Sequence, residues 1–320
     1  MKRILITGVD GQIGSELFEL YREDEGVDHV VGLDIRPPQK LQWSEDGLFE
    51  VRDATDKDAL REVIKKYEIT TIFHLVGILS AKGENNPDLA WHVNMTSLKN
   101  ILDLSREFNL KVFWPSSIAA FGLSAPRDNT PQNTILDPTT IYGITKVAGE
   151  LLCNYYYHKF GIDVRSIRFP GIISYDTPPG GGTTDYAVDM FYYALRNEQY
   201  PCFVTEETTL PMMYMSDAIK SIIDIMRADK EKIQVRTSYN VTGISFAARE
   251  LELEIKKHFP EFSCIYSPDY RQKIADSWPR SIDDSLAREQ WQWQHDFDLQ
   301  RITADMIENL QIKAKTDLAV

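Results

Sequence analysis

The sequence predicts an α/β fold in which a doubly wound parallel sheet carries a smaller C-terminal lobe. Strand and helix signals alternate through the first half of the chain, as they do in parallel sheets with helices on both faces. A glycine-rich turn joins the first expected strand to the first expected helix. The chain has 320 residues, of which 43% are hydrophobic, so it can fill one large domain or two lobes.

The first expected unit is a strand, a turn and a helix. Residues 2–7 end in a short apolar run with β-branched residues, which is typical of a buried strand. The turn follows with glycines at three-residue spacing, and the helix then shows apolar residues at helical spacing: Gly8, Gly11 and Gly14, then Ile13, Leu17, Leu20 and Tyr21. Such glycines let a pyrophosphate approach the backbone at a helix N-terminus, as in a Rossmann dinucleotide site. The spacing differs from the more familiar G-x-G-x-x-G, and a glycine trio alone is a poor signal.

The second expected strand, residues 29–34, ends in a carboxylate. Asp34 lies about twenty residues after Gly14, where an acid can accept both ribose hydroxyls of an adenosine and would repel a 2′-phosphate. This position favours NAD over NADP, although Arg36 could weaken the preference. The alternative is that Asp34 is a plain turn residue before two prolines.

The other expected elements follow in order. Further strands are predicted at 49–52, 70–76, 112–114 and 164–168, and helices at 58–67, 88–108 and 140–160. After Pro170 we expect a mobile, breaker-rich loop at 178–184, helices at 185–197 and 216–227, a returning strand at 238–242 and a largely helical remainder. Residues 1–173 would form the NAD-binding Rossmann domain. Residues 174–320 would form mainly a substrate-binding lobe, with segments at about 210–245 returning to the first domain.

A Tyr-x-x-x-Lys element in the 140–160 helix is the candidate catalytic pair. Helical geometry places Tyr142 and Lys146 one turn apart on one face, and the ammonium should lower the pKa of the phenol. Tyr142 is therefore a candidate proton acceptor. Ser116 and Ser117 follow the fifth strand directly, at the edge where the helix and the glycine turn should meet. Taken alone, such Tyr/Lys pairs are common on solvated helix faces, and a serine pair after a strand is commonly a turn.

Composition excludes several functional classes. A formal charge of −13 and a pI near 5 argue against a nucleic-acid or anionic-membrane surface. No apolar run reaches membrane-spanning length, and the first strand begins too early to leave room for a leader peptide. The three cysteines are far apart and fit a reducing, cytoplasmic compartment, and the scattered histidines show no zinc-ligand spacing. His74 is predicted to be a hydrogen-bonded core residue.

In this combination the chain resembles the extended short-chain dehydrogenase/reductase family, also called epimerase-like. The residues that match are Gly8, Gly11, Gly14, Asp34, Asp53, Asn94, Ser117, Tyr142 and Lys146. The resemblance implies that Ser117 steadies the reacting oxygen and that Tyr142 is the acid/base. It also implies that Lys146 binds the nicotinamide ribose and lowers the pKa of Tyr142. Phe121 departs from the pattern, because the family's S-x-x-x-Y-G segment has tyrosine there.

The resemblance further implies NAD as the cofactor. Its expected contacts are Gly8, Gly11, Gln12, Ile13, Gly14, Asp34, Asp53, Ala54, Leu75, Gly77, Asn94, Ser116, Tyr142, Lys146, Pro170 and Ile172.

Longer segments are similar to one branch of that family, the short-chain-type L-threonine 3-dehydrogenases. They are residues 77–84, 168–174, 182–188, 210–215 and 277–279. Members of this branch oxidise the threonine β-hydroxyl with NAD, giving 2-amino-3-ketobutyrate without a metal. The resemblance implies an amino acid substrate held by Ser80, Ser117, Tyr142, Gly182, Thr183, Thr184 and Trp278.

The resemblance also implies a homodimer formed through the Tyr/Lys helix. Leu151, Leu152, Tyr155 and Tyr156 extend that helix with more apolar surface than one core face needs. The alternative is that all four pack internally.

Two other functions stay open. A UDP-sugar epimerase or dehydratase uses the same Ser/Tyr/Lys set, but it needs basic residues for a diphosphate, and the 178–184 loop contains neither Lys nor Arg. A regulatory protein could bind NAD without turnover, but such proteins typically lose the tyrosine or the lysine, and both are present here.

Overall fold

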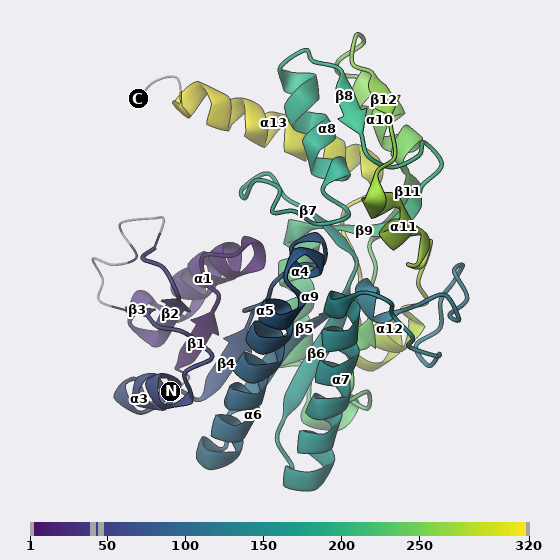
Figure 1. Ribbon diagram of the computed structural model, residues 1–320. Helices are drawn as coiled ribbons and strands as arrows, with labels where there is room; N and C mark the ends of the chain where they lie inside the picture. Colours follow the sequence, from purple (N-terminus) through teal and green to yellow (C-terminus); the bar gives the residue numbers. More distant parts are fainter. Residues whose placement is uncertain (1–2, 39–42, 44–47, 318–320) are drawn as a thin grey trace.

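A seven-stranded parallel sheet forms the body of the molecule. The computed structural model describes residues 3–38, 43 and 48–317. The strand order is β10-β6-β5-β4-β1-β2-β3, with every neighbouring pair parallel (Figure 1). The strands are β1 (Ile4–Thr7), β2 (Val30–Asp34), β3 (Phe49–Val51), β4 (Thr71–His74), β5 (Lys111–Ser117), β6 (Val164–Phe169) and β10 (Tyr239–Asn240). The predicted doubly wound fold is confirmed, and the strand expected at 238–242 returns to the edge of this sheet beside β6.

Helices cover both faces of the sheet because successive strand residues point to opposite sides. Ile4 and Ile6 pack in one buried cluster with α1 (Gln12–Glu25) and α9 (Met215–Arg227). Leu5 packs in the other, with α3 (Lys57–Lys66), α6 (Ser97–Phe108) and α7 (Ile141–Phe160). The sheet is thus buried on both faces, as the near-continuous apolar strands predict.

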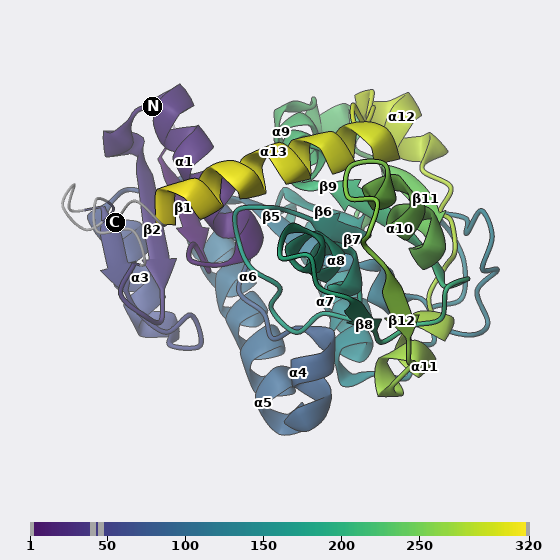
Figure 2. The ribbon, with the colours of Figure 1, turned by 90° about the horizontal axis from the view of Figure 1, so that it is seen from above.

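A smaller lobe lies over the carboxyl ends of the strands (Figure 1). It contains two small sheets, β11-β9-β7 and β12-β8. Its elements are β7 (Gly171–Ile173), α8 (Tyr186–Leu195), β8 (Tyr200–Cys202), β9 (Thr209–Tyr214), β11 (Ile244–Ala247), α10 (Ala248–Lys256), β12 (Cys264–Tyr266) and α11 (Tyr270–Asp276). Two more helices complete the chain, α12 (Ser285–Trp291) and α13 (Leu299–Asp317). Figure 2 shows α13 crossing the molecule from the side of α12 to that of α1.

The main differences from expectation concern short elements. The helix expected at 88–108 is α5 (Pro87–Trp91) and α6, joined by a π-helical turn at His92–Thr96. A short helix, α4 (Ser80–Asn85), precedes them. The C-terminal remainder is not simply helical, because β11 and β12 lie within it. Strands of three or four residues are too short to produce a periodic signal.

His74 is the predicted core histidine. It is fully buried, and its ring nitrogens contact the hydroxyls of Thr7 at 2.7 Å and Ser97 at 3.0 Å. Burial lowers its pKa to about 3, so it is neutral. Within the described residues, no helix is long and apolar enough to cross a membrane.

Candidate active site

One cavity of about 270 Å³ lies between the main sheet and the smaller lobe. Its walls come from the glycine turn, the ends of β4, β5 and β6, the start of α7, and the loop before α8. The lining residues are Gly8, Gly11, Gln12, Ile13, Gly14, Leu75, Val76, Gly77, Leu79, Ser80, Pro115, Ser116, Ser117, Ile118, Tyr142, Lys146, Phe169, Pro170, Gly171, Ile172, Gly182, Thr183, Thr184, Asp185 and Trp278.

The glycine turn leaves no space for side chains. Gly8 has a φ of +75°, and a Cβ there would lie 2.9 Å from the Val76 nitrogen. A Cβ on Gly14 would lie 2.3 Å from the Gly8 carbonyl oxygen. The backbone at the N-terminus of α1 therefore faces the cavity uncovered, which fits a pyrophosphate bound by N–H groups and the helix dipole.

Asp34 is oriented by backbone groups at the end of β2. Its two carboxylate oxygens accept hydrogen bonds from Ile35 N at 2.8 Å and Asp10 N at 3.2 Å. Each oxygen still has a lone pair for a ribose hydroxyl. The donors of the turn and this acceptor together fit an adenosine dinucleotide.

Other predicted cofactor residues do not line the cavity. The Asp53 carboxylate accepts a bond from Thr55 N at 2.8 Å, and Ala54 is buried with its carbonyl bonded to the Asn100 amide. Both residues follow β3, so they lie at the carboxyl end of the strands, as Asp34 does at the end of the neighbouring β2.

Asn94 lies in the π-helical turn and makes structural bonds. Its oxygen accepts from Ile78 N at 2.7 Å, and its amide donates to the Ile78 carbonyl and the Thr145 hydroxyl, both at 3.2 Å. Asn94 therefore ties the loop after β4 to α7, next to the candidate catalytic pair. The helical turn that carries it is widened at this point.

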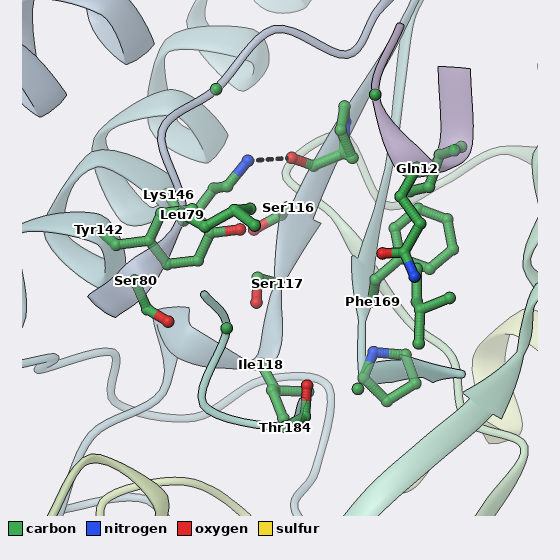
Figure 3. Close-up of a pocket in the computed structure, with 18 of the residues that line it drawn as sticks. Gln12, Leu79, Ser80, Ser116, Ser117, Ile118, Tyr142, Lys146, Phe169 and Thr184 are labelled. Carbon is green, nitrogen blue, oxygen red and sulfur yellow. Dashed lines mark hydrogen bonds between the residues drawn. The ribbon is translucent and has the colours of Figure 1, made fainter. Parts of the chain in front are cut away.

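The structure brings Tyr142, Lys146 and Ser117 together. Thr140 caps α7 by accepting a hydrogen bond from Gly143 N at 3.1 Å. The Lys146 ammonium lies 5.3 Å from the centroid of the Tyr142 ring and donates to the Pro115 carbonyl at 2.6 Å. Figure 3 shows the phenol pointing toward the serines at the end of β5. The predicted convergence of α7 with β5 is thus present in the structure.

Burial dominates the electrostatics of this cluster. It raises the pKa of Tyr142 to about 12, while a hydrogen bond with Ser117 acts in the opposite direction. It also lowers the pKa of Lys146 to about 8. Burial is the largest cause, so the pKa of Tyr142 lies above its ordinary value in this structure, and the lowering effect of Lys146 that the spacing predicts stays a prediction.

Ser116 differs from Ser117 in its partner. Ser116 is 2% exposed, and its hydroxyl donates to the Glu150 carboxylate at 2.6 Å. Glu150 is also bonded to Arg168 through two nitrogens, at 2.8 Å and 2.7 Å. Neither of these charged residues was predicted, although Glu150 continues the four-residue spacing of Tyr142 and Lys146.

The opposite wall is the loop before α8, residues 176–185. The hydroxyls of Thr183 and Ser80, both buried, lie 3.2 Å apart. Asp185, which was not predicted, accepts bonds from Gly181 N and Gly182 N, both at 2.8 Å. A Cβ on Gly182 would lie 2.7 Å from the Asp185 carboxylate oxygen, so a larger residue there would displace the side chain that holds the loop. The predicted Thr184 and Trp278 complete the wall.

Sequence reasoning also missed Leu79, Ile118 and Phe169 in the lining. They are apolar residues at the ends of elements, and no local pattern distinguishes them from core residues. In the described part of the chain, no three His, Cys, Asp or Glu side chains are grouped as metal ligands would be.

Comparison with known proteins places this geometry in context. Residues 4–242 match the NAD dependent epimerase/dehydratase family. An uncharacterized epimerase/dehydratase of Staphylococcus haemolyticus is 47% identical over 98% of this chain and 99% of its own length. The solved structure of an L-threonine dehydrogenase from Clostridium difficile is 49% identical, covers 98% of each chain and superposes with a TM-score of 0.95. A monomeric L-threonine 3-dehydrogenase from a metagenome is 45% identical over 97% of this chain and 99% of its own, with a TM-score of 0.93.

Proposed function

The chain belongs to the NAD dependent epimerase/dehydratase family, and we propose that it is an NAD-dependent L-threonine 3-dehydrogenase of the short-chain type. The observation that carries the proposal is the cavity itself. It joins a dinucleotide turn to a small pocket walled by hydroxyls, with a tyrosine, a lysine and a serine at the junction. Such a pocket suits a small zwitterion with one reacting hydroxyl.

The cofactor would occupy the side of the glycine turn. The backbone of Gly8, Gly11 and Gly14 would face the pyrophosphate, and Asp34 would accept from the adenosine ribose. The other predicted contacts on the main sheet complete the proposed NAD site: Gln12, Ile13, Asp53, Ala54, Leu75, Gly77, Asn94, Ser116, Tyr142, Lys146, Pro170 and Ile172. In this proposal residues 1–173, with parts of 210–245, bind NAD, and the rest of 174–320 mainly binds substrate.

The chemistry divides between the cofactor and three side chains. NAD, when bound, would supply the acceptor for the hydride from the threonine Cβ. The Tyr142 phenolate removes the proton from the β-hydroxyl, and Ser117 donates a hydrogen bond to the same oxygen. The ammonium of Lys146 favours the phenolate form of Tyr142 and would donate to the nicotinamide ribose. The Tyr142 phenolate takes the proton and NAD would take the hydride. The proposed reaction therefore requires no metal ion.

The amino acid would be held by the loop before α8. Ser80, Gly182, Thr183 and Thr184 offer hydroxyls and backbone groups, and Trp278 closes one side. These groups exclude water from the reacting atoms when the substrate is bound.

A homodimer through α5 and α7 is part of the proposal. Leu151 and Tyr155 are 59% and 52% exposed, and Trp91 on α5 is 47% exposed. Tyr156, by contrast, is buried, so the four apolar residues noted on α7 do not all face outward. Analytical ultracentrifugation tests this state directly, since a chain that sediments as a monomer at all concentrations excludes it. We also propose a cytoplasmic location, which the free thiols of Cys153, Cys202 and Cys264 support.

The test of the function is NADH absorbance at 340 nm with L-threonine as substrate. L-serine, D-threonine and UDP-glucose serve as comparison substrates in the same assay. We expect NADH only with L-threonine, or most rapidly with it. Absence of NADH with L-threonine, or NAD that stays bound while UDP-glucose is epimerised, would overturn the proposal. Among the described residues that line the cavity, Lys146 is the only lysine or arginine, so the substrate side offers no additional cation for the diphosphate of a sugar nucleotide.

A further inference from the structure

Glu150 is a fully buried acid next to the candidate active site, bonded to the cavity-lining Ser116. It lies on α7 one turn after Lys146, which itself lies one turn after Tyr142. Its carboxylate accepts from the Ser116 hydroxyl and from two nitrogens of Arg168. The carboxylate is thus held by three donors, two of them from a guanidinium.

Two bonds, one turn apart on α7, hold the end of β5. Lys146 donates to the Pro115 carbonyl at 2.6 Å, and the next residue, Ser116, donates to Glu150 at 2.6 Å. The residue after these two is Ser117, which lines the cavity together with Tyr142 and acts on the pKa of its phenol. The position of Ser117 relative to Tyr142 is therefore fixed by a cation and an anion on the same helix face.

Arg168 connects this arrangement to the rest of the sheet. Its register partner on β5 is Ser116, and its remaining nitrogen donates at 3.0 Å to the Gln132 carbonyl and to the Asn240 side chain. Asn240 belongs to β10, at the edge of the sheet. The guanidinium thus has partners on several elements, which orients the carboxylate that it pairs with.

We propose that Glu150 is a positioning residue for the reaction, holding Ser117 against Tyr142 through Ser116 and placing its carboxylate one turn from Lys146 on α7. This inference rests on the proposed function, because it assigns Glu150 to the same catalytic site. Glu150 touches neither cofactor nor substrate, so it acts only through Ser116 and Lys146. The negative charge of Glu150 opposes the effect of burial on the Lys146 ammonium.

The kinetic signature follows from the protonation states. Turnover requires Tyr142 without its proton and Lys146 with its proton. The fraction of enzyme in this state rises tenfold per pH unit up to the pKa of Lys146 and is then constant until the pKa of Tyr142. The pH at which kcat/KM stops rising therefore reports Lys146.

The test compares Glu150→Gln, Ser116→Ala and a matched control, Asp163→Asn. Asp163 is likewise bonded to a buried arginine of β6, Arg165, but it precedes the strand and lies at its amino end, away from the cavity at the carboxyl ends of the strands. For Glu150→Gln we expect kcat to fall about 30- to 100-fold. We expect the break in the pH profile to move down by about one to two pH units.

Ser116→Ala keeps the Glu150–Arg168 pair and removes the hydrogen bond from β5 to Glu150. Because Ser116 is also a proposed NAD contact, kcat is measured at saturating NAD. It should lower kcat about tenfold and leave the break unchanged, and it keeps the proposal testable if Glu150→Gln does not fold. Asp163→Asn should lower Tm without moving the break. The proposal is overturned if Ser116→Ala leaves kcat at the wild-type value. It is also overturned if a folded Glu150→Gln keeps the wild-type break, or if Asp163→Asn shifts the break equally.

A readout without substrate separates this inference from the proposed function. Competitive acetylation of the native protein, followed by mass spectrometry of the Lys146 peptide, gives the pH midpoint of that amine. A lower midpoint in Glu150→Gln supports the inference even if wild-type enzyme does not oxidise L-threonine. An unchanged midpoint contradicts it even if wild-type enzyme does.

Discussion

The two walls of the cavity are constructed in different ways. The wall formed by α7 and β5 consists of regular elements. Lys146 and Ser116 are almost completely buried there, with Lys146 donating to the Pro115 carbonyl and Ser116 to the carboxylate of the buried Glu150. The wall formed by residues 176–185 is half-buried irregular backbone, held by Asp185, by the Ser80–Thr183 contact and by Lys313 of α13.

This difference separates chemistry from selection. Groups fixed on rigid elements hold reacting atoms in place, whereas loops tolerate change and carry specificity. Changes in the α7–β5 wall should therefore lower kcat, and changes in the loop wall should mainly raise KM. The following predictions test that separation, beginning with the largest effect.

Replacement of the proposed base should have the largest effect. Tyr142→Phe removes the only phenol in the cavity lining, and we expect kcat to fall about 10³-fold or more. NADH binding, followed by fluorescence, should remain within about threefold of wild type, since most cofactor contacts are elsewhere. Tyr155→Phe, an exposed position on the same helix, is the control. Turnover close to wild type in Tyr142→Phe would remove the base from the mechanism.

The wild-type kcat/KM should depend strongly on pH, because two residues of the α7–β5 wall, Tyr142 and Lys146, titrate. With the pKa of Tyr142 raised to about 12 and that of Lys146 lowered to about 8, kcat/KM should rise with unit slope and flatten near pH 8. This corresponds to roughly a hundredfold increase between pH 6 and pH 8. Initial rates at saturating NAD measure it. A flat profile over this range would mean that the proton is accepted by another group.

Loss of the loop acid should affect KM. Asp185→Ala leaves the N–H groups of Gly181 and Gly182 without their acceptor, so the loop loses its local order. We expect the KM for L-threonine to rise about tenfold with kcat within about twofold. Asp24→Asn, an exposed acid paired with Arg227, should change neither. A fall in kcat equal to that of Ser116→Ala would show that both walls support the chemical step.

The smallest expected effect is at the contact between the loop and α4. Thr183→Val keeps the volume of the side chain and removes the hydroxyl that faces Ser80. One hydrogen bond of this kind corresponds to about a threefold increase in KM. Thr209→Val, whose hydroxyl bonds only a nearby surface carbonyl, is the control. An effect larger than that of Asp185→Ala would mean that Thr183 contacts the substrate more strongly than the loop geometry indicates.

The sequence alone predicted the features that depend on local pattern. The glycine turn, Asp34 and the Tyr/Lys pair each lie within or directly after one element, so spacing identifies them. Ser116 and Ser117 were placed near Tyr142 because a strand end and a helix start must meet at one edge of a parallel sheet, and the family resemblance then selected Ser117. The long segments at 182–188 and 277–279 located the second wall.

Features that depend on long-range contact were not predictable. Glu150 and Arg168 lie on two different expected elements, a helix and a strand, and only the folded structure brings their side chains together. The raised pKa of Tyr142 is a consequence of burial, which spacing does not reveal. The π-helical turn around Asn94 has no periodic signature, because one extra residue per turn leaves the apolar pattern almost unchanged.

The edge strand β10 also has a consequence for synthesis on the ribosome. β6 emerges well before Tyr239 and Asn240, so its outer edge stays unpaired while the intervening lobe is translated. At about 5–20 residues per second this interval lasts several seconds, during which an open strand edge is exposed to other nascent chains. A release assay that truncates the message before residue 239 should therefore yield aggregated product, whereas release of the complete chain should not.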